Sequence, residues 1–325
     1  MTAALPLPPP PEWAHHTGVW IGFPSHPELW LDDLAPARVE VAAFARAVHA
    51  EGRGEKVILV CADGEATSAA AVLAPYADTI VEPFGDIWLR DTGPIVLPGR
   101  AARLFRFNGW GGKYDLPGDD DIGRRLAAAR RLHAQACDWV LEGGAIDGDG
   151  TGTVITTEQC LLNLNRNPDL SRAEIEARLA ADLGLTRIVW LGEGLLNDHT
   201  DGHVDNLARF VGEGRVAIPE ATDNDPNWQV YQHARRDLLA AGLEVVTIPS
   251  PGRVIRDEEV VPASYMNFYI GNAAVVVPLY GAENDDAAVA AIGALFPDRV
   301  ATGIRADHIL TGGGSFHCIS QQIPG

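Results

Sequence analysis

The stretch SRAEIEARLAADLGLTRIVWL, residues 171–191, predicts a helix over 171–183 that is followed by a short apolar strand, RIVWL. The same order of helix and apolar strand returns along the chain, and we expect further long helices near residues 35–50, 119–134, 228–241 and 285–296. From the second helix onward, the predicted starts at residues 119, 171, 228 and 285 lie 52 to 57 residues apart. A fixed period of this size is typical of radial or stacked repeat architectures.

Each repeating unit combines strands with one helix, a composition that excludes an all-β propeller. Strand pairs over 153–162, 204–218 and 266–278 fill the intervals between the helices. Because no stretch has the composition of an interdomain linker, we predict a single α/β domain over residues 1–325, built as a closed ring of strand-strand-helix-strand units. In such a ring the loops converge on one axis, so polar clusters far apart in sequence are expected to share one central site.

The charge balance limits the classes of partner. The chain has 325 residues, of which 46% are hydrophobic, enough for a sizeable core, and 25 Lys and Arg against 44 Asp and Glu give a net charge of -19. A chain this acidic lacks the basic face that releases counterions from nucleic acid, and anionic membranes repel it. We therefore expect neither nucleic acid nor membrane as a partner, and a small cation as the class of ligand that the charge favours.

Cysteine usage and targeting signals bear on the compartment. The four cysteines show neither the CxxC spacing nor the density of a disulfide-stapled protein, which favours reduced thiols. The first residues, MTAALPLPPPPEW, have no basic region and no long apolar run, and no later stretch has the apolar length of a membrane span. We expect a soluble, cytoplasmic protein.

The stretch GGGSFHCISQQIPG, residues 312–325, places Cys318 behind three consecutive glycines. Glycine adopts positive φ and lets the backbone approach another group closely, so Gly313 and its neighbours are candidates for the wall of a ligand site. Cys318 is then the candidate nucleophile. A tight turn around a buried, inert cysteine is the alternative.

Two aromatic segments, DIWLRDTGP over 86–94 and FNGWGGKY over 107–114, form a second cluster. A carboxylate among apolar residues needs a cation or several donors, because burying it unpaired is costly. For Asp86 we expect an internal ion pair with Arg90, whereas Asp91 is a candidate site residue beside a predicted turn. Two tryptophans belong either to the core or to an aromatic slot that would suit a cation: Trp88 and Trp110.

The segment NDHTDGHVDNLARFV, residues 197–211, combines imidazoles with carboxylates. If its apolar run is a strand, the alternation of side chains puts His203 and Asp205 on one face, where a base and a carboxylate are presented together. Zinc binding by His199, His203 and Asp205 is the competing interpretation. The i, i+4 histidine pair would need a helix, which Gly202 and the β-branched residues disfavour.

Three other acidic residues give weaker signals. Asp198 and Asp201 are expected to be solvated loop charges. Glu142, in LEGGA over 141–145, ends an apolar run directly before two glycines. Catalytic carboxylates often occupy such strand ends, and so do surface turns.

Together the clusters supply a thiol, an imidazole, several carboxylates and glycine loops. A Cys–His pair alone is typical of acyl transfer, as in cysteine proteases and amidases. Additional carboxylates suit that chemistry poorly, because an oxyanion hole needs donors. They suit a guanidinium, whose planar set of N–H donors is bound by carboxylates through paired, charge-assisted hydrogen bonds.

The segments WLRDTGP, FNGWGGKY, EGG, TDGHVDN and GGGSFHCISQQIP, in this order over nearly the whole chain, resemble those of the agmatine deiminases and the related bacterial peptidylarginine-deiminase-like proteins. The resemblance implies a five-bladed α/β propeller of the guanidino-group-modifying (pentein) superfamily, without cofactor or metal. It implies hydrolysis of agmatine to N-carbamoylputrescine and ammonia through a covalent thiouronium on the cysteine. The alternatives are a deiminase of arginine, peptidyl-arginine or another guanidine, an amidinotransferase, and a non-catalytic binder of polyamine-like cations.

The resemblance also implies roles for individual residues. Cys318 is the nucleophile, His203 the general acid and base, and Glu142 the residue that supports His203. Asp91 and Asp205 bind the guanidinium. Further substrate contacts are expected from Trp88, Trp110, His199 and Gly313.

One position departs from the family. Several agmatine deiminases have an acidic residue four positions before the catalytic histidine, where this chain has His199. Agmatine is still expected over arginine, because the motif segments leave Lys113 as the one cation without an assigned partner for an α-carboxylate. His317 is expected to be structural, since neighbours on an extended strand face opposite ways. Assembly into a dimer or tetramer stays open.

Overall fold

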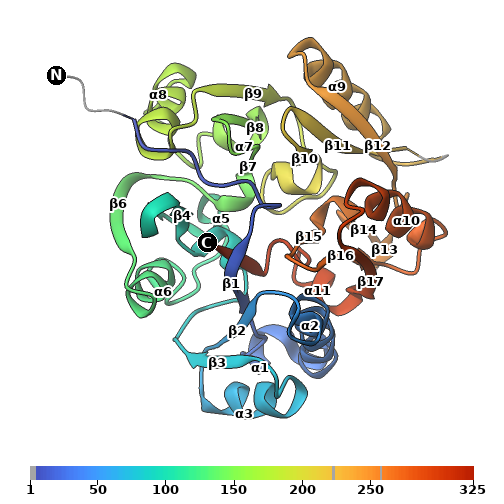
Figure 1. The fold of residues 1–325 in the computed structure, drawn as a ribbon. Coiled ribbons are helices and arrows are strands. Elements are labelled where there is room, and N and C mark those ends of the chain that lie inside the picture. Colours follow the sequence, from blue (N-terminus) through green and yellow to red (C-terminus); the bar gives the residue numbers. More distant parts are fainter. Residues whose placement is uncertain (1–4, 222–223, 257) are drawn as a thin grey trace.

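Sheets of three or four strands surround a common centre, and the long helices lie outside this ring (Figure 1). The computed structural model describes residues 5–221, 224–256 and 258–325. Within them, four sheets share one three-stranded order, in which the first two strands are antiparallel and the third is parallel to the second. A helix precedes the third strand of each sheet. The predicted α/β class is therefore confirmed.

These four sheets contain, in chain order, β4 (Ile95–Leu97), β5 (Ala101–Arg106) and β6 (His133–Val140); β7 (Ile146–Gly148), β8 (Thr153–Thr157) and β9 (Arg187–Leu191); β10 (Arg209–Gly212), β11 (Arg215–Glu220) and β12 (Glu244–Pro249); β15 (Tyr269–Ile270), β16 (Ala274–Leu279) and β17 (Val300–Arg305). A separate antiparallel pair is formed by β13 (Ile255–Arg256) and β14 (Glu259–Val260).

A further sheet joins the two ends of the described chain. It contains β1 (His16–Gly22), β2 (Lys56–Cys61), β3 (Asp78–Val81) and β18 (Ser320–Pro324), in the order β18-β1-β2-β3. The strand β18 runs antiparallel to β1, with Trp20 opposite Gln321. This pairing brings Cys318, two residues before β18, to the centre of the ring, where the end of the chain is drawn in Figure 1.

The helices are α1 (Pro27–Trp30), α2 (Leu34–His49), α3 (Gly64–Leu73), α4 (Leu89–Thr92), α5 (Gly109–Gly112), α6 (Ile122–Ala129), α7 (Glu158–Leu161), α8 (Arg172–Leu183), α9 (Trp228–Ala240), α10 (Asp285–Leu295) and α11 (Asp307–Thr311). Short 3₁₀ turns include η4 (Gly143–Ala145), η5 (Val204–Asn206) and η6 (Tyr265–Asn267). The five long helices predicted from the sequence correspond to α2, α6, α8, α9 and α10.

The helix α8 shows why the repeating stretch folds as predicted. Ser171 caps its first turn and forms a reciprocal capping box with Glu174, which satisfies backbone groups that the helix itself leaves open. Gly184 ends the helix in the left-handed conformation, with φ of 67°. The buried face repeats at every fourth position, through Ile175, Leu179 and Leu183.

The predicted strand pairs are partly wrong. The chain over 153–162 keeps β8 but turns into α7 at residue 158, because the Thr157 hydroxyl accepts a hydrogen bond from the Cys160 amide and caps a helical turn. The segment at 204–206 is the 3₁₀ turn η5 and not the beginning of a strand. Both turns lie next to the centre of the ring, where the chain leaves the sheets to present side chains.

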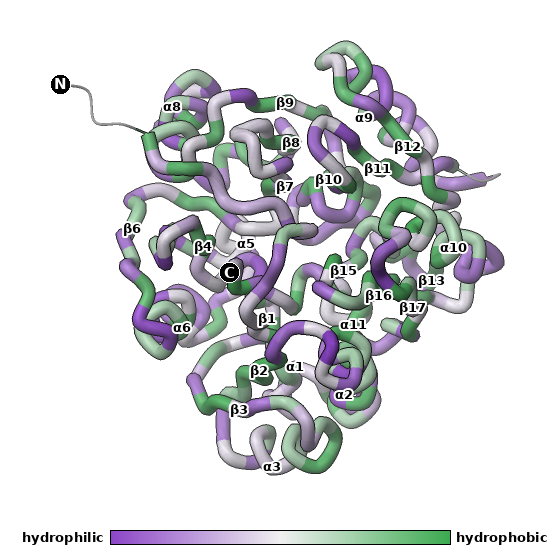
Figure 2. Tube along the Cα trace, viewed as in Figure 1, coloured by the Kyte–Doolittle hydropathy of each residue, from purple (hydrophilic) through white to green (hydrophobic). Residues whose placement is uncertain are grey.

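Apolar side chains hold the sheets to their helices. Figure 2 shows hydrophilic and hydrophobic residues interleaved along the outer helices, as expected for helices with one buried face. The largest hydrophobic cluster links β1, β2 and α2 to β16 and to the segment before β18. None of the helices in the described residues has the length and apolar character of a membrane span.

A stacked aromatic pair fixes the segment that carries Cys318. The rings of Phe316 and Phe44 lie parallel with their centroids 4.7 Å apart, and both side chains are fully buried. Phe316→Ala should lower the free energy of unfolding by about 3–5 kcal/mol, because it leaves a cavity in a core that cannot collapse fully. Urea denaturation measures this loss. Val72→Ala, on the exposed side of α3, is the control and should change stability by less than about 0.5 kcal/mol; equal effects would show that Phe316 does not anchor the segment.

Candidate active site

A cavity of about 200 Å³ opens at the centre of the ring. Its wall includes residues from segments that are far apart in sequence, among them α4, α5 and the loop before β18. Six of the residues predicted from the sequence line it: Trp88, Asp91, Trp110, His199, Gly313 and Cys318. His203, Asp205 and Glu142 are completely buried beside it.

The thiol of Cys318 is almost fully buried and is held by polar neighbours. The side-chain amide of Asn267 donates to Sγ at 3.0 Å, and the Asn267 oxygen accepts from the Cys318 amide at 3.2 Å. The thiol faces the carboxylate of Asp205, with Sγ 3.6 Å from Oδ2. Burial and the charges of Asp205 and Asp91 raise the pKa of Cys318 well above its ordinary value. The thiol is therefore protonated when the cavity holds no cation.

The glycines before Cys318 allow the backbone to pack against the cavity wall. A Cβ on Gly314 would lie 2.6 Å from the Trp88 ring and 3.1 Å from Sγ of Cys318. Gly313 has a φ of 105°, a conformation that other residues rarely adopt. A side chain at Gly314 would displace the indole or the thiol, whereas at Gly313 the positive φ is what disfavours other residues.

Asp91 is held by two donors on its two oxygens. The Gly144 amide donates to Oδ1 at 2.9 Å, and the Trp110 indole donates to Oδ2 at 2.9 Å. Burial raises the pKa of Asp91; the charge of His203 opposes this, and the charges of Asp205 and Glu142 add to it. A cation in the cavity would relieve this crowding of carboxylates.

Asp205 has one occupied and one free oxygen. Its Oδ2 accepts a hydrogen bond from Nδ1 of His317 at 2.8 Å. Its Oδ1 is buried and has no hydrogen-bond partner in the part of the chain that the structure describes. Burial opposes ionisation, but the hydrogen bond and charge of His317 outweigh it, and the pKa of Asp205 lies below its ordinary value. The result is an ionised carboxylate with an open acceptor beside the thiol.

The predicted alternation of His203 and Asp205 along a strand is wrong. His203 is extended and precedes η5, and Asp205 lies within that turn. The two side chains nevertheless converge, together with Asp91, on Gly144. A Cβ on Gly144 would lie 2.6 Å from Nδ1 of His203, 2.9 Å from Oδ1 of Asp91 and 3.0 Å from Oδ2 of Asp205. Only glycine leaves room for this convergence.

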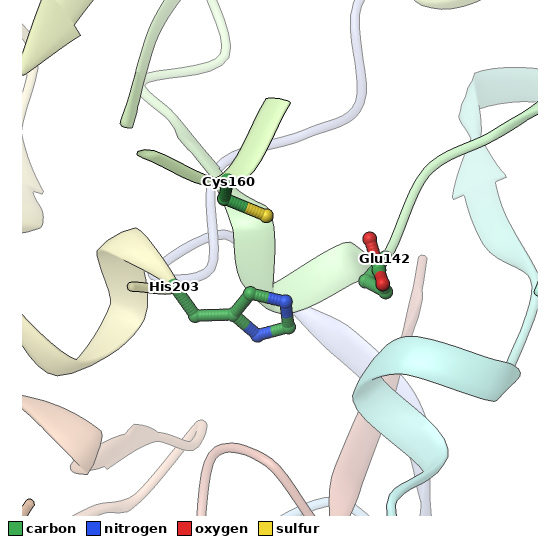
Figure 3. A group of neighbouring side chains, drawn as sticks. All are labelled: Glu142, Cys160 and His203. Atoms are coloured by element: carbon green, nitrogen blue, oxygen red, sulfur yellow. The ribbon is translucent and has the colours of Figure 1, made fainter. Parts of the chain in front are cut away.

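His203 lies between carboxylates. Its Nδ1 is 3.7 Å from Oδ1 of Asp91, and Glu142 lies on its other side (Figure 3). Burial alone would lower the pKa of His203, but the charge of Asp91, the Cys160 thiol and Glu142 together raise it well above its ordinary value. The ring is therefore an imidazolium. Glu142 is itself fixed by Arg166, whose Nε donates to Oε1 at 2.8 Å.

A second thiol lies beside the histidine. Ligand atoms of Glu142, Cys160 and His203 all lie within 4.8 Å of one another (Figure 3). These donor types are those that a zinc ion uses, but Arg166 already places a positive charge on the Glu142 carboxylate. The zinc set considered from the sequence is not assembled among the described residues, because His199 lies at the cavity wall, where Nδ1 is 3.1 Å from the Tyr114 hydroxyl.

The predicted ion pair between Asp86 and Arg90 is wrong. Asp86 accepts hydrogen bonds from the indoles of Trp30 at 3.1 Å and Trp88 at 2.6 Å. Arg90, on α4, points toward β18, donates to Gln322 at 2.7 Å and lies 3.7 Å from the Glu12 carboxylate. Arg90 lies on the short helix and Asp86 before it, and the two side chains have different partners.

The acidic residues near His199 are not solvated charges. Asp198 is mostly buried and accepts hydrogen bonds from the Thr200 amide and hydroxyl. Asp201 pairs with Lys113 and Arg166. Lys113 is therefore paired with Asp201, and the expectation from the sequence that it has no assigned partner is wrong.

Several residues of the site were missed from the sequence. Asn267, Arg166, Cys160 and Gly144 contact the predicted groups, yet none lies at a spacing that marks a site. The double glycine after Glu142 was the one local signal, because a glycine often marks a close approach of backbone and another group.

Comparisons with known proteins cover nearly the whole chain. The family model for Porphyromonas-type peptidyl-arginine deiminase matches residues 9–324. An agmatine deiminase from Stutzerimonas stutzeri is 38% identical over 357 residues, which cover 97% of this chain and 95% of the relative.

Two solved structures of agmatine deiminases superpose on nearly the whole chain. The agmatine deiminase of Enterococcus faecalis superposes with a TM-score of 0.91 at 31% identity, covering 98% of this chain and 96% of the other. A Cys→Ser variant of the C. jejuni agmatine deiminase with substrate bound superposes with a TM-score of 0.93 at 28% identity. The superposition covers 100% of this chain and 98% of the other.

Alkylation should distinguish Cys318 from the other thiols. Iodoacetamide should modify Cys318 before Cys61, Cys137 and Cys160, because Cys318 lines the cavity and the other three do not. The rate should keep rising above pH 8.5, the range of a free thiol, because the pKa of Cys318 is raised. Peptide mapping after partial labelling at several pH values measures both effects; earlier labelling of another cysteine would contradict this description of the cavity.

Proposed function

Because the chain belongs to the Porphyromonas-type peptidyl-arginine deiminase family, we propose that it is a hydrolase that converts agmatine to N-carbamoylputrescine and ammonia. The identity of the substrate is inferred from the relatives named above, since each is described as an agmatine deiminase. The chain-wide coverage supports transfer of the reaction to this chain.

The observation that carries the proposal is the buried Asp205 carboxylate, whose Oδ2 lies 3.6 Å from Sγ of Cys318 and whose Oδ1 has no hydrogen-bond partner among the described residues. A buried carboxylate oxygen without a donor is costly, so it marks a place for a ligand that brings N–H groups and positive charge. Asp91 supplies a second carboxylate toward the same cavity. A guanidinium bound by these two groups presents its central carbon to Sγ.

The first half of the reaction forms a carbon–sulfur bond. The bound cation offsets the charges of Asp91 and Asp205, which lowers the pKa of Cys318 from its raised value and favours the thiolate. The Cys318 thiol loses its proton to water, and the thiolate attacks the guanidinium carbon to give a tetrahedral adduct. His203, as imidazolium, donates its proton to the departing nitrogen, and ammonia leaves. The product of this half is an S-alkylthiouronium on Cys318.

The second half restores the thiol. Neutral His203 takes a proton from water, and the resulting hydroxide attacks the thiouronium carbon. The carbon–sulfur bond breaks, the hydroxyl proton of the adduct passes to the departing sulfur, and the neutral ureido product leaves the Cys318 thiol behind. Glu142, held by Arg166, keeps negative charge beside His203 and supports its return to imidazolium.

We also propose that the ring is a five-bladed α/β propeller. Four three-stranded sheets of the same order, and a four-stranded sheet that joins β18 to β1, support five blades around the site. Each blade would then contribute loops to the centre, as the positions of Asp91, Glu142, Asp205, Asn267 and Cys318 suggest.

The cavity wall favours agmatine over arginine. Two carboxylates besides Asp91 line it, Asp33 and Asp86, and the described lining residues include no Lys or Arg. Burial raises the pKa of Asp86 to about 6, although three donors oppose the shift, so a bound ammonium would favour its ionised form. The α-carboxylate of arginine would meet acidic groups here. A peptidyl-arginine would also have to fit its backbone into a cavity of about 200 Å³.

The proposal is tested by product formation. Wild-type protein incubated with agmatine should release ammonia and a ureido product in equal amounts, detected by enzymatic ammonia assay and colorimetric ureido assay. Cys318→Ser should lower kcat by more than about a thousandfold, because a hydroxyl is hardly ionised near neutral pH. Retention of activity within tenfold would exclude the covalent mechanism.

The controls for this assay address the alternatives. Turnover without an added amine acceptor excludes an amidinotransferase, and binding without product would indicate a cation-binding protein. Activity after exhaustive EDTA treatment is expected, because each step has a protein residue; loss on chelation and recovery with zinc would point to the Glu142, Cys160 and His203 cluster.

Substrate choice gives a separate prediction. The kcat/KM for agmatine should exceed that for arginine by at least about tenfold, because an α-carboxylate pays the cost of an unpaired buried charge. His199→Asp should raise the agmatine value, since it adds a carboxylate to the cavity wall. Parallel progress curves with agmatine, arginine and a peptidyl-arginine measure the order. An arginine or peptidyl-arginine value equal to that of agmatine would reject this assignment.

A further inference from the structure

The segment before β1 reaches the centre of the ring, and Glu12 is its buried end. Figure 1 shows this segment crossing the middle of the ring before β1. The Glu12 carboxylate accepts from the Ile270 amide at 2.7 Å on Oε1. On Oε2 it accepts from Arg209 at 2.7 Å and from Nε2 of His317 at 2.8 Å. In the described part of the chain, each group that hydrogen-bonds to this carboxylate is a donor.

His317 connects Glu12 to the site. Its Nε2 faces Glu12 and its Nδ1 faces Asp205, each at 2.8 Å, and the ring is almost fully buried. Burial would raise the pKa values of the Glu12 and Asp205 carboxyl groups, yet both lie below their ordinary values. The charge of Arg209 is the largest cause that lowers the pKa of Glu12. The hydrogen bond from His317 is the largest cause that lowers the pKa of Asp205. Both partners are carboxyl groups, so the geometry offers an acceptor to a proton on each ring nitrogen of His317.

We propose that Glu12 is a positioning residue for the reaction, which holds His317 as an imidazolium and thereby keeps Asp205 ionised and oriented toward the guanidinium. The role of Asp205 in this chain of contacts rests on the proposed function. The contacts among Glu12, His317 and Asp205 do not.

A carboxylate is the group that this position needs. Glutamine could present its oxygen to Arg209 and His317, but its NH₂ would then face the Ile270 N–H, a second donor. The opposite orientation would set the NH₂ against two donors. In either case His317 loses a charged acceptor and with it the reason to keep its second proton.

The charges around this pair set the direction of the effect. They come from the elements on both sides of the ring centre: Arg90, Arg209 and Asp147 around Glu12, and His203, Asp91 and Cys318 around Asp205. If His317 becomes neutral, Asp205 loses its nearest positive charge and its pKa rises. The group is then protonated at a higher pH, so the acid limb of kcat/KM must move upward.

Glu55 provides a matched control. Its buried carboxylate also accepts from a histidine, His16 at 3.1 Å, from the Tyr269 hydroxyl at 2.8 Å and from the Asn272 amide at 2.9 Å. It has no contact with His317 or Asp205. Glu12→Gln and Glu55→Gln should therefore both destabilise the fold, while the first alone changes the site.

The first measurement does not need turnover. In protein labelled with ¹⁵N-histidine, the His317 signals, assigned by their loss in His317→Gln, should show two protonated ring nitrogens at pH 7.5 in wild type and Glu55→Gln. Glu12→Gln should show one. Two protonated nitrogens in Glu12→Gln would overturn the proposal, whatever substrate the protein uses.

The second measurement is the pH profile of kcat/KM for agmatine. Glu12→Gln should lower the plateau by about ten- to a hundredfold and move the acid limb upward by about one pH unit or more, while Glu55→Gln keeps the wild-type limb. An unchanged acid limb in Glu12→Gln, or an equal shift in both variants, would overturn the proposal.

If Glu12→Gln does not fold, His317→Gln must reproduce the shift of the acid limb, and a wild-type acid limb in His317→Gln would overturn the proposal. A wild type without ureido product would refute the proposed function and leave the nitrogen signals to decide the role of Glu12.

Discussion

The structure depends on keeping three carboxylates, those of Asp91, Glu142 and Asp205, in a completely or almost completely buried site. Their mutual repulsion would favour protonation or unfolding, and each carboxylate has a basic partner: His203 beside Asp91, Arg166 on Glu142 and His317 on Asp205. Asp91 lines the cavity, Oδ1 of Asp205 has no hydrogen-bond partner among the described residues, and the described cavity wall contains no Lys or Arg. A ligand that brings positive charge would complete this balance.

The thiol follows the same electrostatics. Negative charge on Asp205 and Asp91 makes Cys318 a poor nucleophile while the cavity is empty, because it raises the pKa of the thiol. In the mechanism proposed here, the substrate cation removes that obstacle by its own binding. Reactivity of the thiol is thus coupled to recognition of a planar cation, which protects the sulfur from adventitious electrophiles and oxidants when no substrate is bound.

Sequence reasoning succeeded where a local pattern decides the structure. The capped, amphipathic helix α8 and its counterparts were predictable from spacing, and so was the gathering of distant polar clusters at one centre. It failed where the direction of a side chain in the folded structure decides which residue it contacts. Arg90 and Asp86 are four residues apart, yet Arg90, on α4, points toward β18, and Asp86, before α4, accepts hydrogen bonds from two indoles. Asn267 carries no sequence signal, because a single asparagine near a strand is ordinary, and only the fold brings it to Cys318.

The pairing of β1 with β18 places His16 opposite Pro324 in one sheet, so the first and last strands are neighbours in space. Contacts between residues this far apart along the chain are slow to form, because a very large loop must close before they contribute stability. A circular permutant that joins these two segments and opens the ring at an exposed outer loop would convert the most distant strand pair into a local one. The central site would keep its geometry, and folding would become faster.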